Sequence, residues 1–485
     1  MITFIICVIA LILGYIIYGR FVERIFGADA KRTTPAYTLQ DGVDYIPMPT
    51  WRVFLIQFLN IAGLGPILGA LLGAAYGPVA FIWIVFGCIF AGAVHDYFSG
   101  MLSIKHNGLS IPEIVGTYLG GGFKQFMRVF TLILMILVGA AFISGPAAIM
   151  ASLTPEALTK TFWVWIIFAY YVIATLLPID KIIGKIYPVF GVALIFMAFG
   201  IGSSLFWSST AFHIPELTFD NLVNMKSNAD KFPIFPLLFV TISCGAISGF
   251  HSTQSPLMAR CIKNEKLGRS VFYGAMVAEG LVALIWAAIG MSFYGGVHEL
   301  NQAIAGYHSE ATLAVKEISL KTLGTFGGIL AILGVVAAPI TTGDTAFRSA
   351  RLIAADFLKI GQKKIIKRLL ISIPLFALGF TLTQVKFDIV WRYMFWSNQT
   401  LATVVLWTIT AYLAGEKKPY WITLIPAVFM TAVVINYILI APEGFQINQL
   451  LGNSIAILFS LGTLALFMIL NIRYQVFELR NAHHN

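Results

Sequence analysis

Long apolar runs dominate this chain, and short polar stretches separate them. A helix needs about 20 largely apolar residues to cross the hydrocarbon core of a bilayer. The pattern therefore predicts an all-α polytopic membrane protein with about 13 transmembrane helices. The predicted spans are residues 2–18, 53–74, 77–103, 124–150, 160–178, 187–206, 233–256, 271–294, 324–345, 365–384, 389–414, 420–440 and 450–471.

Composition supports a membrane protein. Hydrophobic residues make up 58% of the chain, charged residues only 11%, and the mean hydropathy is +0.84, whereas soluble domains carry about 25% charged residues. The net charge of +10 comes from basic residues in short loops between apolar runs, which indicates membrane topology and no nucleic-acid partner. The four cysteines show neither a disulfide framework nor zinc-type spacing.

The distribution of lysine and arginine predicts the orientation. Most of the 32 basic residues fall in loops that share one side of the membrane when the N-terminus is outside, and basic loops are cytoplasmic. The C-terminus is then cytoplasmic. No basic segment precedes the first apolar run, so this run is predicted to be a retained helix and not a cleaved signal.

Two of the predicted helices contain glycine-rich interruptions, at Ile61–Pro66 and at Cys244–Ser252. They lie five segments apart, and the predicted orientation makes them run in opposite directions, which suggests inverted repeats. The predicted division is an N-terminal helix and cytoplasmic loop (1–52), a first five-helix repeat (53–206), an outer loop (207–232), an inverted second repeat (233–414), and two C-terminal helices with a cytoplasmic tail (415–485).

Two amphipathic stretches, 109–122 and 297–321, follow the second helix of each repeat. The amino-acid/polyamine/organocation (leucine-transporter-like) fold has a loop helix and an outer lid at these places. The expected fold class is therefore this 5+5 inverted repeat with one extra helix in front and two behind, a point that rests on analogy.

A helix broken inside lipid exposes backbone N–H and C=O groups, so it persists only where the break lines a cavity or meets a ligand. Pro66 suits the start of a second half-helix, and Ser252 or Thr253 is expected to cap the half-helix after the second break. The positive ends of such half-helices attract anions. The alternative is that the glycines only permit close helix packing. The predicted substrate-binding residues are Ala62, Gly63, Gly65, Gly249, Phe250, His251, Ser252, Gln254 and Asn398.

Ionisable groups inside a membrane are usually functional or paired. His95, Asp96 and Glu279 are candidates for proton coupling, with structural hydrogen bonds as the alternative. Asp344 is a further candidate, although a helix cap or a pair with Arg348 or Arg351 is favoured.

Thr341 and Thr342 would offer oxygen ligands to sodium where the second and ninth helices cross. Asn398 and the adjacent Gln399 are as suited to interhelical bonds as to substrate contact. His95, Asp96, His251 and Asp344 are residue types that bind metals, but no spacing links them, so no metal site and no cofactor are predicted. The sequence has no Walker motif, which argues against ATP-driven pumping.

Several runs identify the chain as similar to the carbon starvation protein A (CstA) family. They are Asp41–Pro47, Ala62–Pro66, Ala91–Asp96, Ser248–Pro256, Thr342–Arg351 and, more weakly, Trp396–Gln399. Together they span residues 41 to about 400. The resemblance implies a multi-pass transporter of the bacterial cytoplasmic membrane that imports nutrients in carbon starvation. It implies either pyruvate, taken up with protons, or short peptides as substrate, and does not choose between them.

The expected function is secondary active transport of a small carboxylate-bearing nutrient between the two broken helices. Proton coupling through His95–Asp96 or Glu279 is the first expectation, and sodium coupling is the second. A channel lacks its expected rings of charge or carbonyl groups. An intramembrane enzyme or sensor lacks nucleophile–base or metal-ligand spacing. No enzymatic activity is therefore expected, and the sequence leaves the oligomeric state open.

Overall fold

The computed structural model describes residues 1–176, 183–207, 213–307, 312–362 and 364–482, and within them it contains helices but no strand. Five short π-helical segments and two 3-10 turns, labelled η, interrupt or join the α-helices. The elements are α1 Ile2–Leu13, η1 Gly14–Tyr18, α2 Gly19–Phe26, α3 Pro35–Thr38, α4 Thr50–Ile61, η2 Gly65–Gly69, α5 Ala70–Ala74, α6 Val79–Ile82, η3 Trp83–Gly92, α7 Ala93–Lys105, α8 Ile111–Leu119, α9 Gly121–Leu153, α10 Lys160–Leu176, α11 Ile183–Trp207, η4 Phe219–Asn221, η5 Ile234–Leu238, α12 Phe239–Thr241, α13 Gly249–Ala259, η6 Glu265–Leu267, η7 Arg269–Tyr273, α14 Gly274–Phe293, α15 Val297–Gly306, α16 Thr312–Leu358, α17 Ile365–Leu382, α18 Phe387–Gly415, α19 Trp421–Ile440 and α20 Gln449–Ala482.

The chain is a multi-pass membrane protein by the length and apolarity of its helices. Among the described residues, nine helices are long and apolar enough to span a bilayer, and α4 with η2 and α5 makes a tenth as one bent span. Each of the thirteen predicted segments falls on helical structure, but three of them are not among these ten spans: α10 is shorter, α12–α13 is broken, and α18 does not meet the same criterion of length and apolarity. The count of thirteen spans therefore stays a prediction, and the last two residues of the fifth predicted segment, 177 and 178, lie outside the described residues.

Both predicted breaks are present. The first span turns by 51° between α4 and the segment Gly65–Ala74. Ala62 leaves helical geometry with ψ of 45°, and Pro66 lies at the start of η2, where its missing N–H costs nothing. The second break separates the short α12 from α13 and includes Gly245 at φ +93°, a backbone conformation that favours glycine.

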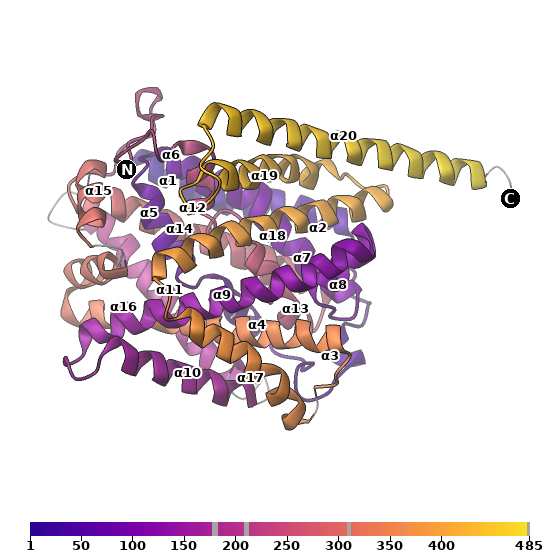
Figure 1. Cartoon of the computed structure of the whole chain (residues 1–485), viewed down its shortest axis with the longest axis horizontal. Coiled ribbons are helices and arrows are strands. Elements are labelled where there is room, and N and C mark those ends of the chain that lie inside the picture. Colours follow the sequence, from indigo (N-terminus) through magenta and orange to yellow (C-terminus); the bar gives the residue numbers. More distant parts are fainter. Residues whose placement is uncertain (177–182, 208–212, 308–311, 363, 483–485) are drawn as a thin grey trace.

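The broken helices lie in the protein interior. The apolar windows of Val79–Lys105 and Glu265–Phe293 are both 78% buried, whereas those of Ile2–Phe26 and Gln449–Ile472 are 22% and 11% buried. The first and last spans therefore face the surroundings, and the helices that pack on the breaks form the centre. Figure 1 shows α20 along one edge of the bundle, with its C-terminal end projecting beyond the other helices.

The amphipathic stretches also form helices. The stretch 109–122 contains α8, which packs against α9. The stretch 297–321 contains α15 and the first turns of α16, while its residues 308–311 lie outside the described part of the chain. Helix α15 packs against α14.

Candidate substrate and ion site

The two breaks pack directly against each other. A Cβ atom built on Gly65 would lie 2.4 Å from Cys244 Sγ and 2.5 Å from Cys244 Cβ. A Cβ on Gly245 would lie 2.4 Å from the Cβ of Ala283 in α14. Only glycine permits these approaches without displacement, so close packing and the break in the helix are both needed here.

The first break presents a row of backbone donors. Gly63, Leu64 and Gly65 are buried, and their N–H groups make no hydrogen bond with any residue that the structure describes. Buried backbone donors are nearly always paired in folded proteins, because an unmet donor loses its hydration without compensation. Three consecutive free N–H groups are suited to an anion.

The second break is closed differently. Helix α13 begins at Gly249, and the N–H of Phe250 donates to Asn398 Oδ1 at 2.6 Å. The prediction that Ser252 or Thr253 caps this half-helix is wrong, because both lie inside its first turns and their hydroxyls donate to carbonyls three residues earlier. Asn398 of α18 supplies the cap instead, because α18 packs closely on the start of α13.

The contact between α13 and α18 is tight. A Cβ on Gly249 would lie 2.3 Å from the backbone oxygen of Asn398 and 2.4 Å from the backbone nitrogen of Ala402. Gln254 lies one turn further along α13, where its Nε2 donates to the hydroxyl of Thr253 at 2.9 Å. Its Oε1 atom is buried and has no hydrogen-bond partner within the described residues.

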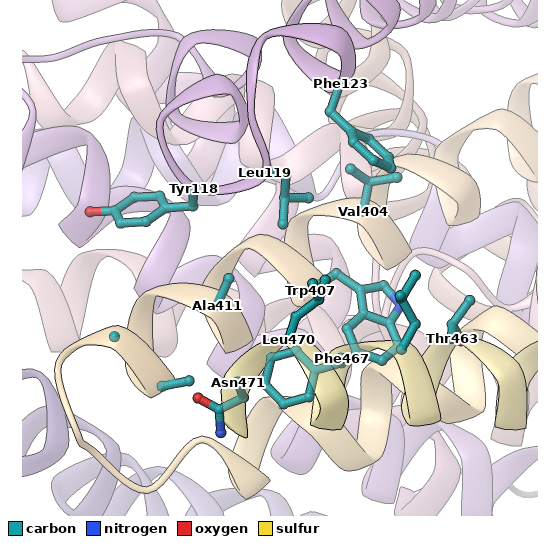
Figure 2. Close-up of a pocket in the computed structure, with 13 residues that line it drawn as sticks. Tyr118, Leu119, Phe123, Val404, Trp407, Ala411, Thr463, Phe467, Leu470 and Asn471 are labelled. Carbon is teal, nitrogen blue, oxygen red and sulfur yellow. The ribbon is translucent and has the colours of Figure 1, made fainter. Parts of the chain in front are cut away.

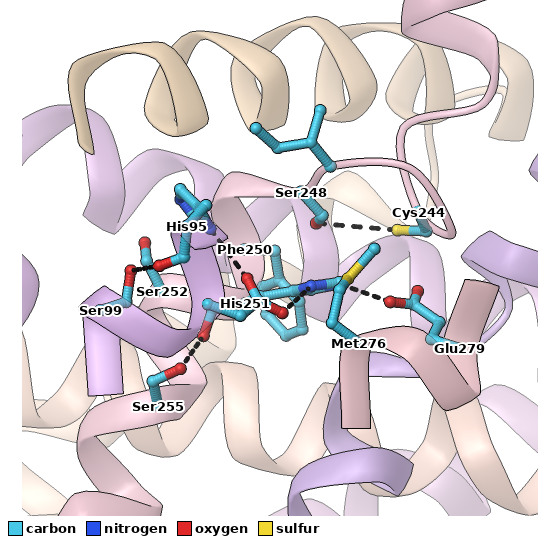
Figure 3. Close-up of polar contacts among 12 residues, drawn as sticks. His95, Ser99, Cys244, Ser248, Phe250, His251, Ser252, Ser255, Met276 and Glu279 are labelled. Carbon is cyan, nitrogen blue, oxygen red and sulfur yellow. Dashed lines mark hydrogen bonds and ion pairs between the residues drawn. The ribbon is translucent and has the colours of Figure 1, made fainter. Parts of the chain in front are cut away.

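A chain of four buried ionisable side chains crosses the centre of the protein beside the second break (Figure 3). His95 Nδ1 lies 2.8 Å from Asp96 Oδ1, and Asp96 Oδ2 lies 2.8 Å from His251 Nδ1. His251 Nε2 then faces Glu279 Oε2 at 3.4 Å. All four side chains are 0% exposed. The residues come from α7, α13 and α14, and the sequence did not show that they meet.

The arrangement is suited to sharing protons. His251 lies between two carboxylates, and in a medium of low polarity two unbalanced negative charges would be costly. Protons on the histidines would neutralise them. His95 Nε2 and Glu279 Oε1 have no hydrogen-bond partner in the described structure, so each end of the chain has an atom left free for a further hydrogen bond.

The same place brings together three possible metal ligands. Ligand atoms of Cys244, His251 and Glu279 all lie within 4.8 Å of one another, and the three residues are buried. Figure 3 shows Cys244 and Glu279 on one side of His251 and His95 on the other. Sequence spacing gave no sign of this group. Its histidine is already bracketed by Asp96 and Glu279, so the ion pairs account for the geometry without a metal.

Helix α16 contacts the first break. The hydroxyl of Thr342 donates to the backbone oxygens of Leu59 at 3.1 Å and Ala338 at 2.9 Å. The hydroxyl of Thr341 donates to Ala338. The crossing of the second and ninth predicted helices therefore exists, with Thr342 and the last turn of α4 on its two sides.

Asp344 points toward another neighbour. Its carboxylate accepts a hydrogen bond from the hydroxyl of Tyr187 in α11. Both arginines suggested as its partners approach a different carboxylate: Arg348 and Arg351 lie 3.6 and 3.7 Å from Asp44 Oδ1. The sequence therefore predicted neither Tyr187 as a partner of Asp344 nor Asp44 as a neighbour of the two arginines.

Asp44 lies in a loop and ties it to α16. Burial alone would raise the pKa of Asp44, but the positive charges of Arg351, Arg348, Arg260 and Arg368 hold that pKa below its ordinary value. Asp41 organises the same loop by accepting three backbone N–H bonds, from residues 43, 44 and 45. The run Asp41–Pro47 is thus an anchoring loop.

Asn60, next to the first break, was also not predicted. Its side chain is buried, and neither Oδ1 nor Nδ2 has a hydrogen-bond partner within the described residues. Gln57, one turn earlier, donates weakly to Ser255 at 3.5 Å, and its Oε1 is likewise unmet. The sequence signal for Gln57 and Asn60 was the presence of two amide side chains in a mostly apolar helix that ends at a break.

A cavity lies away from the breaks. Its volume is about 540 Å³, and it opens between α20, α18 and the α8–α9 corner (Figure 2). Apolar side chains such as Trp407 and Phe467 line it, and none of its lining residues is charged. This cavity is poorly suited to a carboxylate, and the breaks remain the better candidate for the site.

Comparison with known proteins shows to which family the chain belongs. The sequence model of the family described as "Carbon starvation protein CstA" matches residues 1–157 and 147–319. The chain belongs to the CstA family. The runs at both breaks and at His95–Asp96 all lie within this match.

Its relatives within the CstA family differ in length. An uncharacterised membrane protein of Haemophilus influenzae is 46% identical over 351 residues, which cover 63% of this chain and 94% of the relative. The peptide transporter CstA of Campylobacter jejuni is 25% identical over 556 residues, covering 86% of this chain and 77% of the relative. The pyruvate/proton symporter BtsT of Escherichia coli is 26% identical over 332 residues, covering 56% of this chain. That match spans only 46% of BtsT.

A solved structure shares the fold. The manganese transporter of Eremococcus coleocola superposes with a TM-score of 0.54 over 90% of this chain and 99% of its own, at 13% sequence identity. At such low identity the similarity concerns the fold alone.

Proposed function

We propose that this CstA-family protein is a secondary active transporter that imports a small carboxylate-bearing nutrient, pyruvate or a short peptide. The free N–H groups of Gly63, Leu64 and Gly65 carry this proposal. They are buried donors that require an anion or water, and a carboxylate is the group that both substrates named among the relatives have in common.

The substrate would lie between the breaks. Its carboxylate would bind the donors at Gly63–Gly65, with Ala62 and Asn60 beside it. On the other side, Asn398 accepts the hydrogen bond of the Phe250 N–H. The start of α13 would therefore bind the substrate through Gly249, Ser252 and Gln254. The N–H of Phe250 would become available only after Asn398 has moved.

Coupling to protons is the first proposal for the driving ion. The chain from His95 through Asp96 and His251 to Glu279 provides adjacent sites between which a proton can move. Its position beside Cys244, which touches the first break, brings the proton sites next to the proposed carboxylate site.

Sodium is the second proposal. The Thr342 hydroxyl and the Leu59 carbonyl lie 3.1 Å apart at the crossing of α16 and α4, and oxygens of this kind are ligands for hard cations. Thr341 and Asp344 would complete such a site from the same helix.

The proposed architecture is a 5+5 inverted repeat, residues 53–206 and 233–414, in the bacterial cytoplasmic membrane with the N-terminus outside. The two breaks, five predicted segments apart and packed on each other, support this arrangement. Alternating access would then come from one group of helices rocking against the other around the breaks.

The test is uptake by proteoliposomes. Labelled pyruvate and a labelled dipeptide are supplied separately, each with a pH gradient or a sodium gradient. We expect accumulation of one substrate driven by the pH gradient. Gly63→Leu should abolish it because a side chain there meets Thr342 Oγ1 and Phe142, whereas Gly462→Leu, at a position with open space around it, should not. If neither substrate accumulates under any gradient, the transport proposal fails.

A further inference from the structure

A second cavity adjoins the second break. Its volume is about 140 Å³, and a single water needs only about 10–15 Å³ in the same measure, so a small organic molecule fits. Thr241, the last residue of α12 before the break, is part of its wall. The lining also includes Tyr76, Lys226, Phe232, Arg392, Tyr437 and Glu443.

Lys226 gives this cavity a cation. Its Nζ lies 4.9 Å from the ring centre of Tyr76 and 5.5 Å from that of Phe232. No carboxylate of the described residues forms an ion pair with it. Burial lowers the pKa of Lys226 to about 8, as expected for an ammonium that only aromatic faces stabilise. An anion beside Lys226 would compensate its ammonium group for the hydration that burial removes.

The cavity's one carboxylate is already engaged. Glu443 lies 3.8 Å from Arg392, and it accepts a hydrogen bond from the hydroxyl of Tyr437. Its Oε2 has no hydrogen-bond partner within the described residues, so the ammonium group of a peptide would have to compete with Arg392 for this oxygen. The lining carries two cationic side chains against this one acidic side chain, and its other walls are largely apolar or aromatic.

We propose that this cavity is an entry site for a small carboxylate without an ammonium group, such as a 2-oxo acid, and that Lys226 selects it. The inference rests on the proposed transport function and sharpens it, because it favours a 2-oxo acid over a peptide. Lys226 lies in the segment 207–232, which is the predicted outer loop. A carboxylate held there lies next to Thr241 and needs to move only past the second break to reach the donors of the first.

The test compares the wild type with Lys226→Met, Lys226→Arg and Lys231→Met in proteoliposomes. Lys231 is an exposed lysine of the same loop and serves as the matched control. We expect Lys226→Met to raise KM for pyruvate by about tenfold to a hundredfold, because the substrate loses one charge-assisted hydrogen bond, and to leave kcat nearly unchanged. Lys226→Arg should raise KM by less, and Lys231→Met should leave it unchanged.

A second variant guards against misfolding. Lys226→Cys should show the same raised KM, and reaction with an aminoethyl thiosulfonate, which restores an ammonium group, should lower KM again. An unchanged KM in Lys226→Met, or a modified Lys226→Cys variant that stays impaired, would overturn the proposal. A wild type that accumulates dipeptide but not pyruvate would overturn the 2-oxo acid assignment. A wild type that transports neither would instead refute the proposed function.

Discussion

The contact between the two breaks makes a quantitative prediction for Gly65→Ala. The added Cβ would lie 2.4 Å from Cys244 Sγ and 2.5 Å from Cys244 Cβ, whereas such atoms normally approach to about 3.5–4.0 Å. Relief requires a displacement of about 1–1.5 Å. Rotation about χ1 of Cys244 moves Sγ but not Cβ, so the backbone of one break must move. Overpacking of this kind costs about 1–3 kcal/mol.

The prediction becomes specific in a double-mutant cycle. Cys244→Gly removes both clashing atoms, so it should restore most of the stability that Gly65→Ala loses. The expected coupling energy is about 1–3 kcal/mol, in favour of the double variant. The measurement is unfolding of the purified protein by denaturant in detergent micelles, for the wild type, both single variants and the double variant.

Gly63→Ala is the matched control. The atoms nearest to its Cβ would belong to Thr342, at 3.0 Å, and to Phe142, at 3.2 Å, and not to Cys244. Cys244→Gly should therefore not rescue Gly63→Ala. If the effects of Gly65→Ala and Cys244→Gly simply add, the two breaks are not in contact in the folded protein, and the proposed site between them loses its basis.

Three further predictions concern polar side chains. Asp96→Asn should reduce accumulation of substrate by about tenfold under a gradient of one pH unit, which stores about 1.4 kcal/mol per coupled proton; exchange without a gradient should persist, and unchanged accumulation would exclude Asp96 from coupling. Asp44→Asn should destabilise the protein by about 3–5 kcal/mol at pH 7. The pKa of Asp44 is lowered in the folded protein. The stabilisation by its carboxylate is therefore present above the ordinary aspartate pKa of about 3.9 and is lost as the pH falls below that pKa. The unfolding curves of the wild type and Asp44→Asn should thus converge in acid. Asn60→Ala should raise KM by about 2–10-fold with little loss of stability, because its amide has no partner within the described protein to lose; destabilisation with unchanged KM would make Asn60 structural.

The sequence was sufficient for features that depend on neighbouring residues. Apolar runs of membrane length placed the helices, and glycines placed both breaks, with Pro66 as a further sign at the first, because helix formation and its interruption are local. The caps were not predictable in this way. The donor at Phe250 is met by Asn398, which is 148 residues away along the chain, and only the packing of α18 on α13 brings them together.

The charged chain shows the same limit. His95 and Asp96 are adjacent in sequence, but their connection to His251 and Glu279 depends on how α7, α13 and α14 pack. Composition showed that each residue was costly in a membrane and hence worth attention. It could not show that hydrogen bonds link His95, Asp96 and His251 and that His251 faces Glu279, nor that Arg348 and Arg351 approach a loop aspartate, because these contacts join distant segments.

The packing of the second break constrains how substrate and proton binding can be linked. Cys244 touches the first break at Gly65, and seven residues later His251 bonds to Asp96 and faces Glu279. A shift of α13 that releases Asn398 from Phe250 would also alter the His251 contacts, because both residues lie in the first turn of the same rigid helix. Filling the donors at Gly63–Gly65 would press on Cys244 and favour such a shift. If the proposed substrate and proton sites are correct, the start of α13 would couple them without a separate relay.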